Sequence, residues 1–156
     1  MITDKNLRVS DAQSITGSAS THNSTDFINF NDIASSNRRR DVGMGETLYA
    51  LFTVTTAPNN LTSVEFQIEL GTAAGGTFTG TEVVTRTRAI EIANLTAGTQ
   101  IILPIPAHSL TGTSSHAMRV RYVTVGSTAA TNGAVTCDII LDEQHTGKHY
   151  ASGFTA

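Results

Sequence analysis

The chain has 156 residues, of which 39% are hydrophobic and only 15% are charged. A chain of this length can form one domain with a sizeable core, so folding needs neither a metal nor a disulfide. The formal net charge of −3 argues against a nucleic-acid-binding protein, which usually carries a basic stripe. No apolar run reaches the 18 or so residues of a membrane-spanning helix, and no apolar stretch follows Lys5 as in a secretory signal. We therefore expect a protein made in a cytoplasm that does not act in a membrane.

Alternation of apolar and polar residues predicts β-strands along most of the chain. The clearest example is 63–70, where Val64 and Phe66 alternate with Glu65 and Gln67, so one face is expected in the core and the other in water. In chain order, about eight strand candidates cover residues 7–15, 26–30, 48–54, 63–70, 82–92, 100–105, 118–122 and 135–141.

Two of these candidates carry a prediction about their place in a sheet. The strand at 48–54 is apolar on both faces because Tyr49 and Leu51 make the face opposite its core side apolar too, so we expect it to be central or to lie under an interface. The strand at 100–105 contains Pro104 and is followed by Pro106. Proline has no N–H to donate, so this strand is expected at an edge.

Segments rich in Gly, Asn, Ser and Pro separate the strand candidates. They lie at 57–60, 71–80, 97–98, 111–115 and 126–133 and are predicted to be turns. Many short strands joined by such turns are typical of sandwiches and barrels. The fold class predicted here is all-β, a jelly-roll-like sandwich of about eight antiparallel strands.

The two ends of the chain differ from the middle. We expect a single β-sandwich domain over 1–156, with an N-terminal segment and polar arm at 1–25, a sandwich core at 26–143 and a docking tail at 144–156. Within the first part, 16–25 is small and polar and reads as a linker or extended arm. The tail carries Tyr150 and Phe154, whereas a disordered tail would normally lack aromatic residues. These two aromatics are therefore candidate contacts with the protein's own domain or with a neighbour.

Catalysis has no support in the sequence. The G-x-S-x-G string of hydrolases and the P-loop string are both absent. Cys137 lies on the apolar face of a strand and is predicted to be a buried structural thiol. His145 and His149, with Asp142 and Glu143 nearby, could in principle form a metal site, but Gly147 argues against a helix that presents both rings on one face. We expect neither an enzyme nor a bound metal or cofactor.

The basic triplet Arg38, Arg39 and Arg40, followed by Asp41, is the strongest local departure from the average composition. It is open to three interpretations. It can be a solvated loop, a docking site for acidic groups on a partner, or a weak nucleic-acid contact. The docking interpretation makes these four residues candidate protein-interaction residues.

Several strings resemble the Bbp16-like capsid cement proteins of tailed bacteriophages. The opening at 1–13 (MITDKNLRVSDAQ), the stretch at 40–46 (RDVGMGE) leading into an apolar strand, and the ending at 149–155 (HYASGFT) are similar to that family. The three strings span the chain from end to end, while the strands between them match only in pattern. The longer polar arm and the triple arginine depart from the family pattern.

The resemblance implies a jelly-roll domain on the outside of an icosahedral head. Its implied partners are the HK97-like major capsid protein and copies of itself, as a dimer or trimer, with no nucleic acid and no membrane. The alternative is a non-enzymatic receptor- or carbohydrate-binding module of a phage fibre, although the absence of Trp weakens a sugar-binding interpretation. A small enzyme on a cupin-like scaffold would need histidines on strands that together hold a metal.

Overall fold

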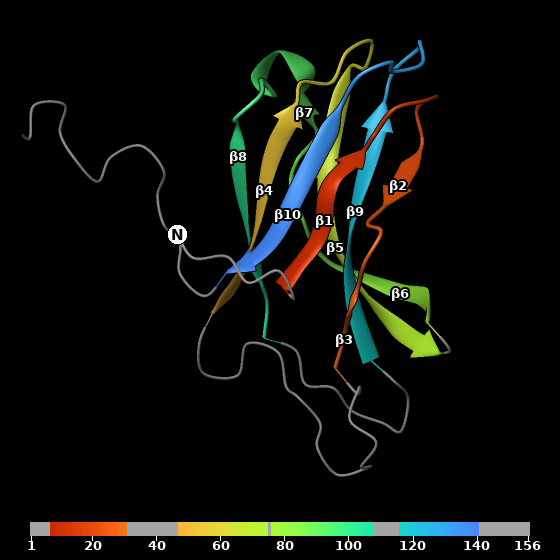
Figure 1. Ribbon diagram of the computed structural model, residues 1–156, viewed down its shortest axis with the longest axis vertical. Helices are drawn as coiled ribbons and strands as arrows, with labels where there is room; N and C mark the ends of the chain where they lie inside the picture. Colours follow the sequence, from red (N-terminus) through yellow and green to blue (C-terminus); the bar gives the residue numbers. More distant parts are fainter. Residues whose placement is uncertain (1–6, 31–46, 75, 108–115, 141–156) are drawn as a thin grey trace, which may run out of the picture.

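Two antiparallel β-sheets face each other around a shared hydrophobic core (Figure 1). This computed structural model describes residues 7–30, 47–74, 76–107 and 116–140. The four-stranded sheet has the order β1, β10, β4, β8, with bounds Arg8–Ser14, Ala134–Ile140, Leu48–Thr56 and Gln100–Ile105. The six-stranded sheet has the order β2, β9, β5, β6, with bounds Thr21–Asn23, His116–Val125, Ser63–Ala74 and Thr77–Arg86. Its two short members are β3 (Ile28–Asn29), which pairs with β9, and β7 (Ile90–Glu91), which pairs with β5.

The order of the strands is that of a jelly roll. The chain crosses from one sheet to the other between β1 and β2, β3 and β4, β4 and β5, β7 and β8, β8 and β9, and β9 and β10. Among the described strands, only β5 and β6 form a hairpin within one sheet. A short 3₁₀ turn, η2 (Ile92–Asn94), lies between β7 and β8. The predicted all-β, jelly-roll-like sandwich is therefore confirmed, with two short strands added to the expected eight.

The core forms because each central strand turns its apolar face toward the other sheet. Phe52 from β4, Phe66 from β5 and Tyr122 from β9 pack together at its centre with ring centroids 5.1 to 6.0 Å apart. All three side chains are fully buried. Burial of one such side chain stabilises the fold by about 1.5–3 kcal/mol, before the cost of ordering the chain is counted. This aromatic cluster joins the two sheets.

The placement of two strands follows the sequence closely. β4 lies between β10 and β8, as its two apolar faces predict, and Leu51 is buried even though it points away from the core cluster. β8 is at the edge of its sheet, as Pro104 requires.

Two predicted boundaries are wrong. The segment 71–80 was expected to be a turn, but most of it belongs to the long β5–β6 hairpin, whose pairs extend to Ala74 and Thr77. The segment 16–25 was expected to be a linker or arm, but Thr21–Asn23 form β2 and pair with β9. Main-chain bonds from Thr124 N to Ser20 O and from Ser24 N to Val120 O hold this segment on the sheet, and such bonds need no apolar side chains.

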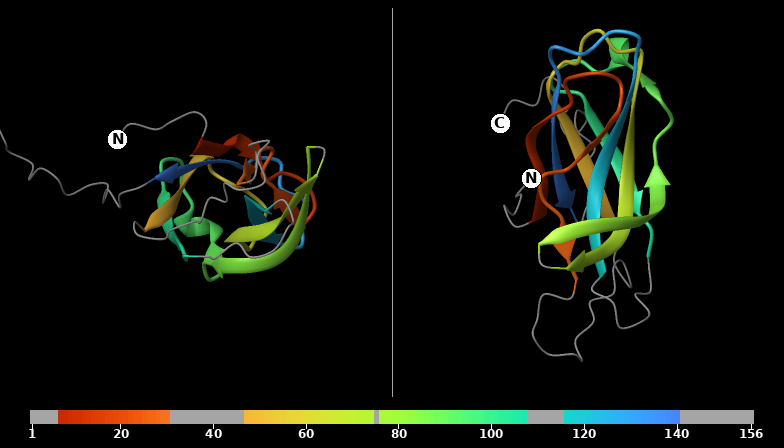
Figure 2. Two further views of the ribbon diagram at one scale, coloured as in Figure 1. Left: turned by 90° about the horizontal axis from the view of Figure 1, so that it is seen from below. Right: turned by 90° about the vertical axis from the view of Figure 1, so that its right-hand side faces the viewer.

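The strand registers bring several chain ends to one end of the sandwich. Phe30 donates its N–H to the carbonyl of His116. Tyr49 pairs with both Ile140 and Pro104, so the start of β4 lies between the ends of β10 and β8. These strand ends lie at the lower end of the sandwich in Figure 1, and the view along the strands in Figure 2 looks onto them. The stretches 31–46, 108–115 and 141–156 are therefore all attached at this end.

Candidate docking surface

The predicted contact residues all lie outside the described residues. Arg38, Arg39, Arg40 and Asp41 belong to the connection between β3 and β4, while Tyr150 and Phe154 follow β10. The structure describes the strands that precede these stretches, but it does not test the residues themselves. What it does describe near the same end is an organised group of side chains on the outer face of the six-stranded sheet.

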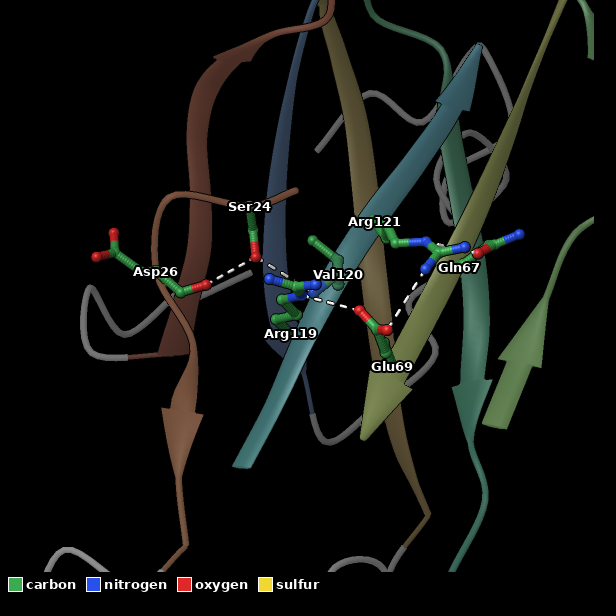
Figure 3. A network of polar contacts seen from close by, with 7 residues as sticks. All are labelled: Ser24, Asp26, Gln67, Glu69, Arg119, Val120 and Arg121. Carbon is green, nitrogen blue, oxygen red and sulfur yellow. Dashed lines mark hydrogen bonds and ion pairs between the residues drawn. The ribbon is translucent and has the colours of Figure 1, made fainter. Parts of the chain in front are cut away.

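At the centre of this group, one buried carboxylate holds two arginines (Figure 3). Arg119 donates from Nε to Glu69 Oε2 at 2.8 Å, and Arg121 Nη1 lies 3.4 Å from Glu69 Oε1. Glu69 is on β5, and both arginines are on its neighbour β9, where Arg119 is the direct cross-strand partner of Glu69. The register of two adjacent strands thus places the opposite charges across from each other, and such cross-strand pairs stabilise a sheet.

The polar chain continues along the sheet toward β6. Arg121 Nε donates to Gln67 Oε1 at 3.0 Å, and Gln67 Nε2 donates to Glu65 Oε1 at 2.7 Å. Arg86 on β6 then forms an ion pair with the same oxygen of Glu65 at 3.6 Å. Three strands are therefore linked by side chains that alternate as donors and acceptors.

An aromatic pair borders the polar chain. The guanidinium of Arg119 lies over the ring of Phe78, 4.3 Å from its centroid, and Phe27 packs against Phe78 with centroids 5.8 Å apart. Beneath Phe78 is Gly71, where an added β-carbon would overlap the ring and the backbone of β6. The cross-strand partner of Gly71 is Ala117, so small residues leave room for the rings. We name Phe27, Glu65, Gln67, Glu69, Phe78, Arg86, Arg119 and Arg121 together the arginine–aromatic face.

Phe27 owes its position to a bridge between the chain after β2 and β9. Ser24 Oγ accepts from the N–H of Val120 at 3.3 Å and donates to the carbonyl of Asp26 at 2.7 Å (Figure 3). Ser24 N donates to the carbonyl of Val120 at 2.9 Å. This bridge fixes the segment just before Phe27 against β9.

The charged side chains of this face differ in exposure. The side chains of Glu69 and Glu65 are 8% and 21% exposed, whereas those of Arg119, Arg121 and Arg86 are 17%, 26% and 68% exposed. Arg86 and Arg121 are more exposed than either carboxylate, whereas Arg119 is slightly less exposed than Glu65. Three positive and two negative groups give a net charge of +1 in a chain whose formal charge is −3.

The opposite face carries a smaller ion-pair group. Arg8 on β1 donates from Nε to Asp138 Oδ1 at 2.9 Å and lies 3.1 Å from Asp11. The bond and the charge of Asp138 raise the pKa of Arg8. This group contains one arginine, and no aromatic pair borders it among the described residues.

Two ionisable groups inside the core are held in their neutral forms. Burial raises the pKa of the Cys137 thiol well above its usual value, as the prediction of a structural cysteine requires. Burial also raises the pKa of Tyr122, although a hydrogen bond to Ser10 opposes this shift. Within the described ranges, no group of three His, Cys, Asp or Glu residues is arranged to hold a metal ion. Nor does this part of the chain contain a helix long and apolar enough to cross a membrane.

Comparison with known protein families gives a match to Bbp16 over residues 9–139, most of the chain. The chain belongs to the Bbp16 family. The suspected resemblance is thereby confirmed, and the family places the chain among bacteriophage-associated proteins. The matched range includes the whole arginine–aromatic face. No curated protein matches the sequence.

Sequence reasoning missed the arginine–aromatic face because it assigned Gln67 and Glu69 to a solvent-exposed face of their strand. Both residues are at most 6% exposed. The sequence did contain the two patterns that form this face. Arg119 and Arg121 share one face of a strand, and Gln67 and Glu69 share one face of another. Only the pairing of β5 with β9, which the sequence does not specify, brings the two patterns together.

Proposed function

We propose that this Bbp16-family chain is a capsid cement protein. In this proposal it binds the outside of an icosahedral phage head and stabilises joints between HK97-like major capsid protein subunits. It acts as a structural protein and not as an enzyme, and copies of it associate as a dimer or trimer. It is made in the host cytoplasm and ends up on the outer surface of the virion. The family match over residues 9–139 is the observation that carries the proposal.

The fold is compatible with this role. A jelly roll provides a rigid scaffold, and the described strand ends that lead into 31–46, 108–115 and 141–156 lie at the same end of it. A protein that binds only the assembled shell stabilises it by mass action, and many symmetric copies add avidity. Both effects need contacts but no catalytic group.

Co-sedimentation tests the proposal. The purified protein is mixed with heads of its own phage from which it has been removed, over a range of protein concentrations. We expect saturable binding at a fixed copy number per head, and heads that regain resistance to heat. Heads that still carry the protein serve as the control and should bind no more. Failure to bind stripped heads would contradict the proposal and favour the receptor- or carbohydrate-binding alternative, which a glycan array tests.

A second experiment concerns the tail. Removing 144–156 should weaken attachment to heads while the remaining chain keeps its β-sheet circular dichroism spectrum. Undiminished attachment would contradict the docking role proposed for Tyr150 and Phe154.

A further inference from the structure

We infer that the arginine–aromatic face is a binding surface for an acidic segment of a partner protein. The inference rests on the proposed function, because it assigns the partner segment to the capsid shell. It adds a location on the jelly roll and a chemistry for the contact, and its argument uses only described residues.

The first argument is the greater exposure of two of the three arginines. Arg86 and Arg121 are more exposed than the carboxylates of Glu65 and Glu69, so a partner approaching this face meets these two arginines first. A carboxylate from outside therefore experiences Arg86 and Arg121 at shorter range than the two negative groups. The whole chain is negative, so this face is a local exception to the overall charge.

The second argument is that the arginines are already ordered. Arg119 is held between Glu69 and Phe78, and Arg121 between Gln67 and Glu69. Binding to long side chains that are ordered in advance loses less conformational entropy than binding to free ones. A guanidinium has five N–H donors, and the described contacts use Nε of Arg119 and Nε and Nη1 of Arg121. The remaining donors can bind a carboxylate with two parallel hydrogen bonds.

The third argument is the apolar border. Phe27 and Phe78 are half-buried, and Val83 on β6 and Val125 on β9 are 37% and 52% exposed. Apolar groups beside charged ones exclude water from a contact and strengthen its hydrogen bonds. The surface thus fits a segment in which acidic residues are mixed with apolar ones.

The experiment compares two arginines in similar surroundings on opposite faces. Arg121 and Arg8 are 26% and 33% exposed, and each forms an ion pair with a carboxylate that is less than 10% exposed. The variants Arg121→Gln and Arg8→Gln therefore lose the same charge and a similar contact. The variant Arg86→Gln removes a largely exposed arginine of the arginine–aromatic face and should not disturb folding. Thermal unfolding establishes that each variant is folded before binding is measured.

Binding of each variant to stripped heads is measured over a salt series. We expect Arg121→Gln and Arg86→Gln to raise Kd roughly tenfold at low salt, the effect of losing one charge-assisted contact. Their Kd should also depend less steeply on salt, whereas Arg8→Gln should follow the wild type. If Arg121→Gln does not fold, Arg86→Gln and the milder Arg121→Lys, which keeps the charge but loses the fork, decide the question.

The outcomes separate the inference from the proposed function. If the wild type binds heads and every variant of the arginine–aromatic face binds equally well, the inference is overturned, but the proposed cement function is not. Loss of wild-type binding altogether would overturn both. A further test is binding to duplex DNA. If the wild type binds DNA and Arg121→Gln abolishes that binding while attachment to heads is unchanged, these arginines bind a nucleic acid and the inference is overturned.

Discussion

The carboxylate of Glu69 occupies the space that a side chain at position 80 would need. A β-carbon built on Gly80 would overlap the carboxylate group of Glu69. The carboxylate cannot move aside freely, because Arg119 and Arg121 hold both of its oxygens. The absence of a side chain at Gly80 is therefore a condition for the arginine–aromatic face to form.

This relationship predicts the effect of Gly80→Ala. The new methyl group should displace the Glu69 carboxylate and loosen both arginines, lowering the free energy of unfolding by about 1–3 kcal/mol, as overpacking usually does. Gly71→Ala should cost at least as much, because its β-carbon would overlap the backbone of Thr79 and not only a side chain. Urea denaturation measures both effects. Gly76→Ala tests an open position with positive φ, where backbone strain acts without any overlap. A Gly80→Ala variant as stable as the wild type would contradict the role given to this glycine.

A second prediction concerns the hydrogen bond from Tyr122 to Ser10 inside the core. Tyr122 Oη donates to Ser10 Oγ at 2.8 Å, and both residues are fully buried. Ser10 faces inward because a register shift in β1 brings it opposite Cys137. Tyr122→Phe leaves the serine hydroxyl without this partner and should lower the free energy of unfolding by about 1–2 kcal/mol. Ser10→Ala should have a similar effect.

The double variant provides the control. Because it removes both hydroxyl groups, it should be destabilised by less than the sum of the two single changes. Effects that simply add in urea denaturation would show that the bond between Tyr122 and Ser10 contributes nothing to stability.

How far the sequence predicts the fold depends on what each segment buries. Strands with an alternating apolar face, such as 63–70, are visible because the pattern itself is the cause of their burial. β2 is not visible, since its main-chain bonds to β9 need no apolar residue. The segment 71–80 is misread because glycine usually marks a turn. Here Gly71 and Gly80 lie within strands, where Phe78 and Glu69 take the space of their missing side chains.

The candidate site is harder to predict than the fold for a related reason. Its ion pairs join the β5–β6 hairpin to β9, which is distant in sequence, and Arg119 and Glu69 are 50 positions apart. A charged residue on an alternating strand normally predicts a solvent-exposed face. Only a neighbouring strand with the complementary charge converts that face into a nearly buried network, and strand neighbours follow from the topology.

A third prediction concerns alkaline pH. Cys137 and Tyr122 both have pKa values raised by burial in the folded protein. In the unfolded chain they ionise at about 8.5 and about 10. Above these pH values the unfolded state loses protons that the folded state keeps. The stabilisation from each group is therefore fully present below its unfolded-state pKa and is lost as pH rises above it. Each ionised group should lower the free energy of unfolding by about 1.4 kcal/mol per pH unit.

Urea denaturation between pH 7 and pH 11 measures this slope. Cys137→Ala should delay the fall until the tyrosine ionises near pH 10, and Tyr122→Phe should reduce the slope above that pH. Equal slopes for all three proteins would mean that neither buried group determines the alkaline limit.

The fourth prediction concerns acid pH at the edge of the six-stranded sheet. His22 lies in β2 with Nε2 3.3 Å from Ser20 Oγ and 3.4 Å from Thr124 Oγ1, and partial burial lowers its pKa. A folded-state pKa below the usual value of about 6.5 means that the neutral ring stabilises the pairing above that pH. This stabilisation is lost as pH falls through the folded-state pKa. Amide hydrogen-exchange protection of Thr21–Asn23 should therefore decrease between pH 7.5 and pH 5, while that of β10 stays constant. In His22→Gln the pH dependence at β2 should disappear. A variant that still loses protection at β2 on acidification would assign the effect to a group other than His22.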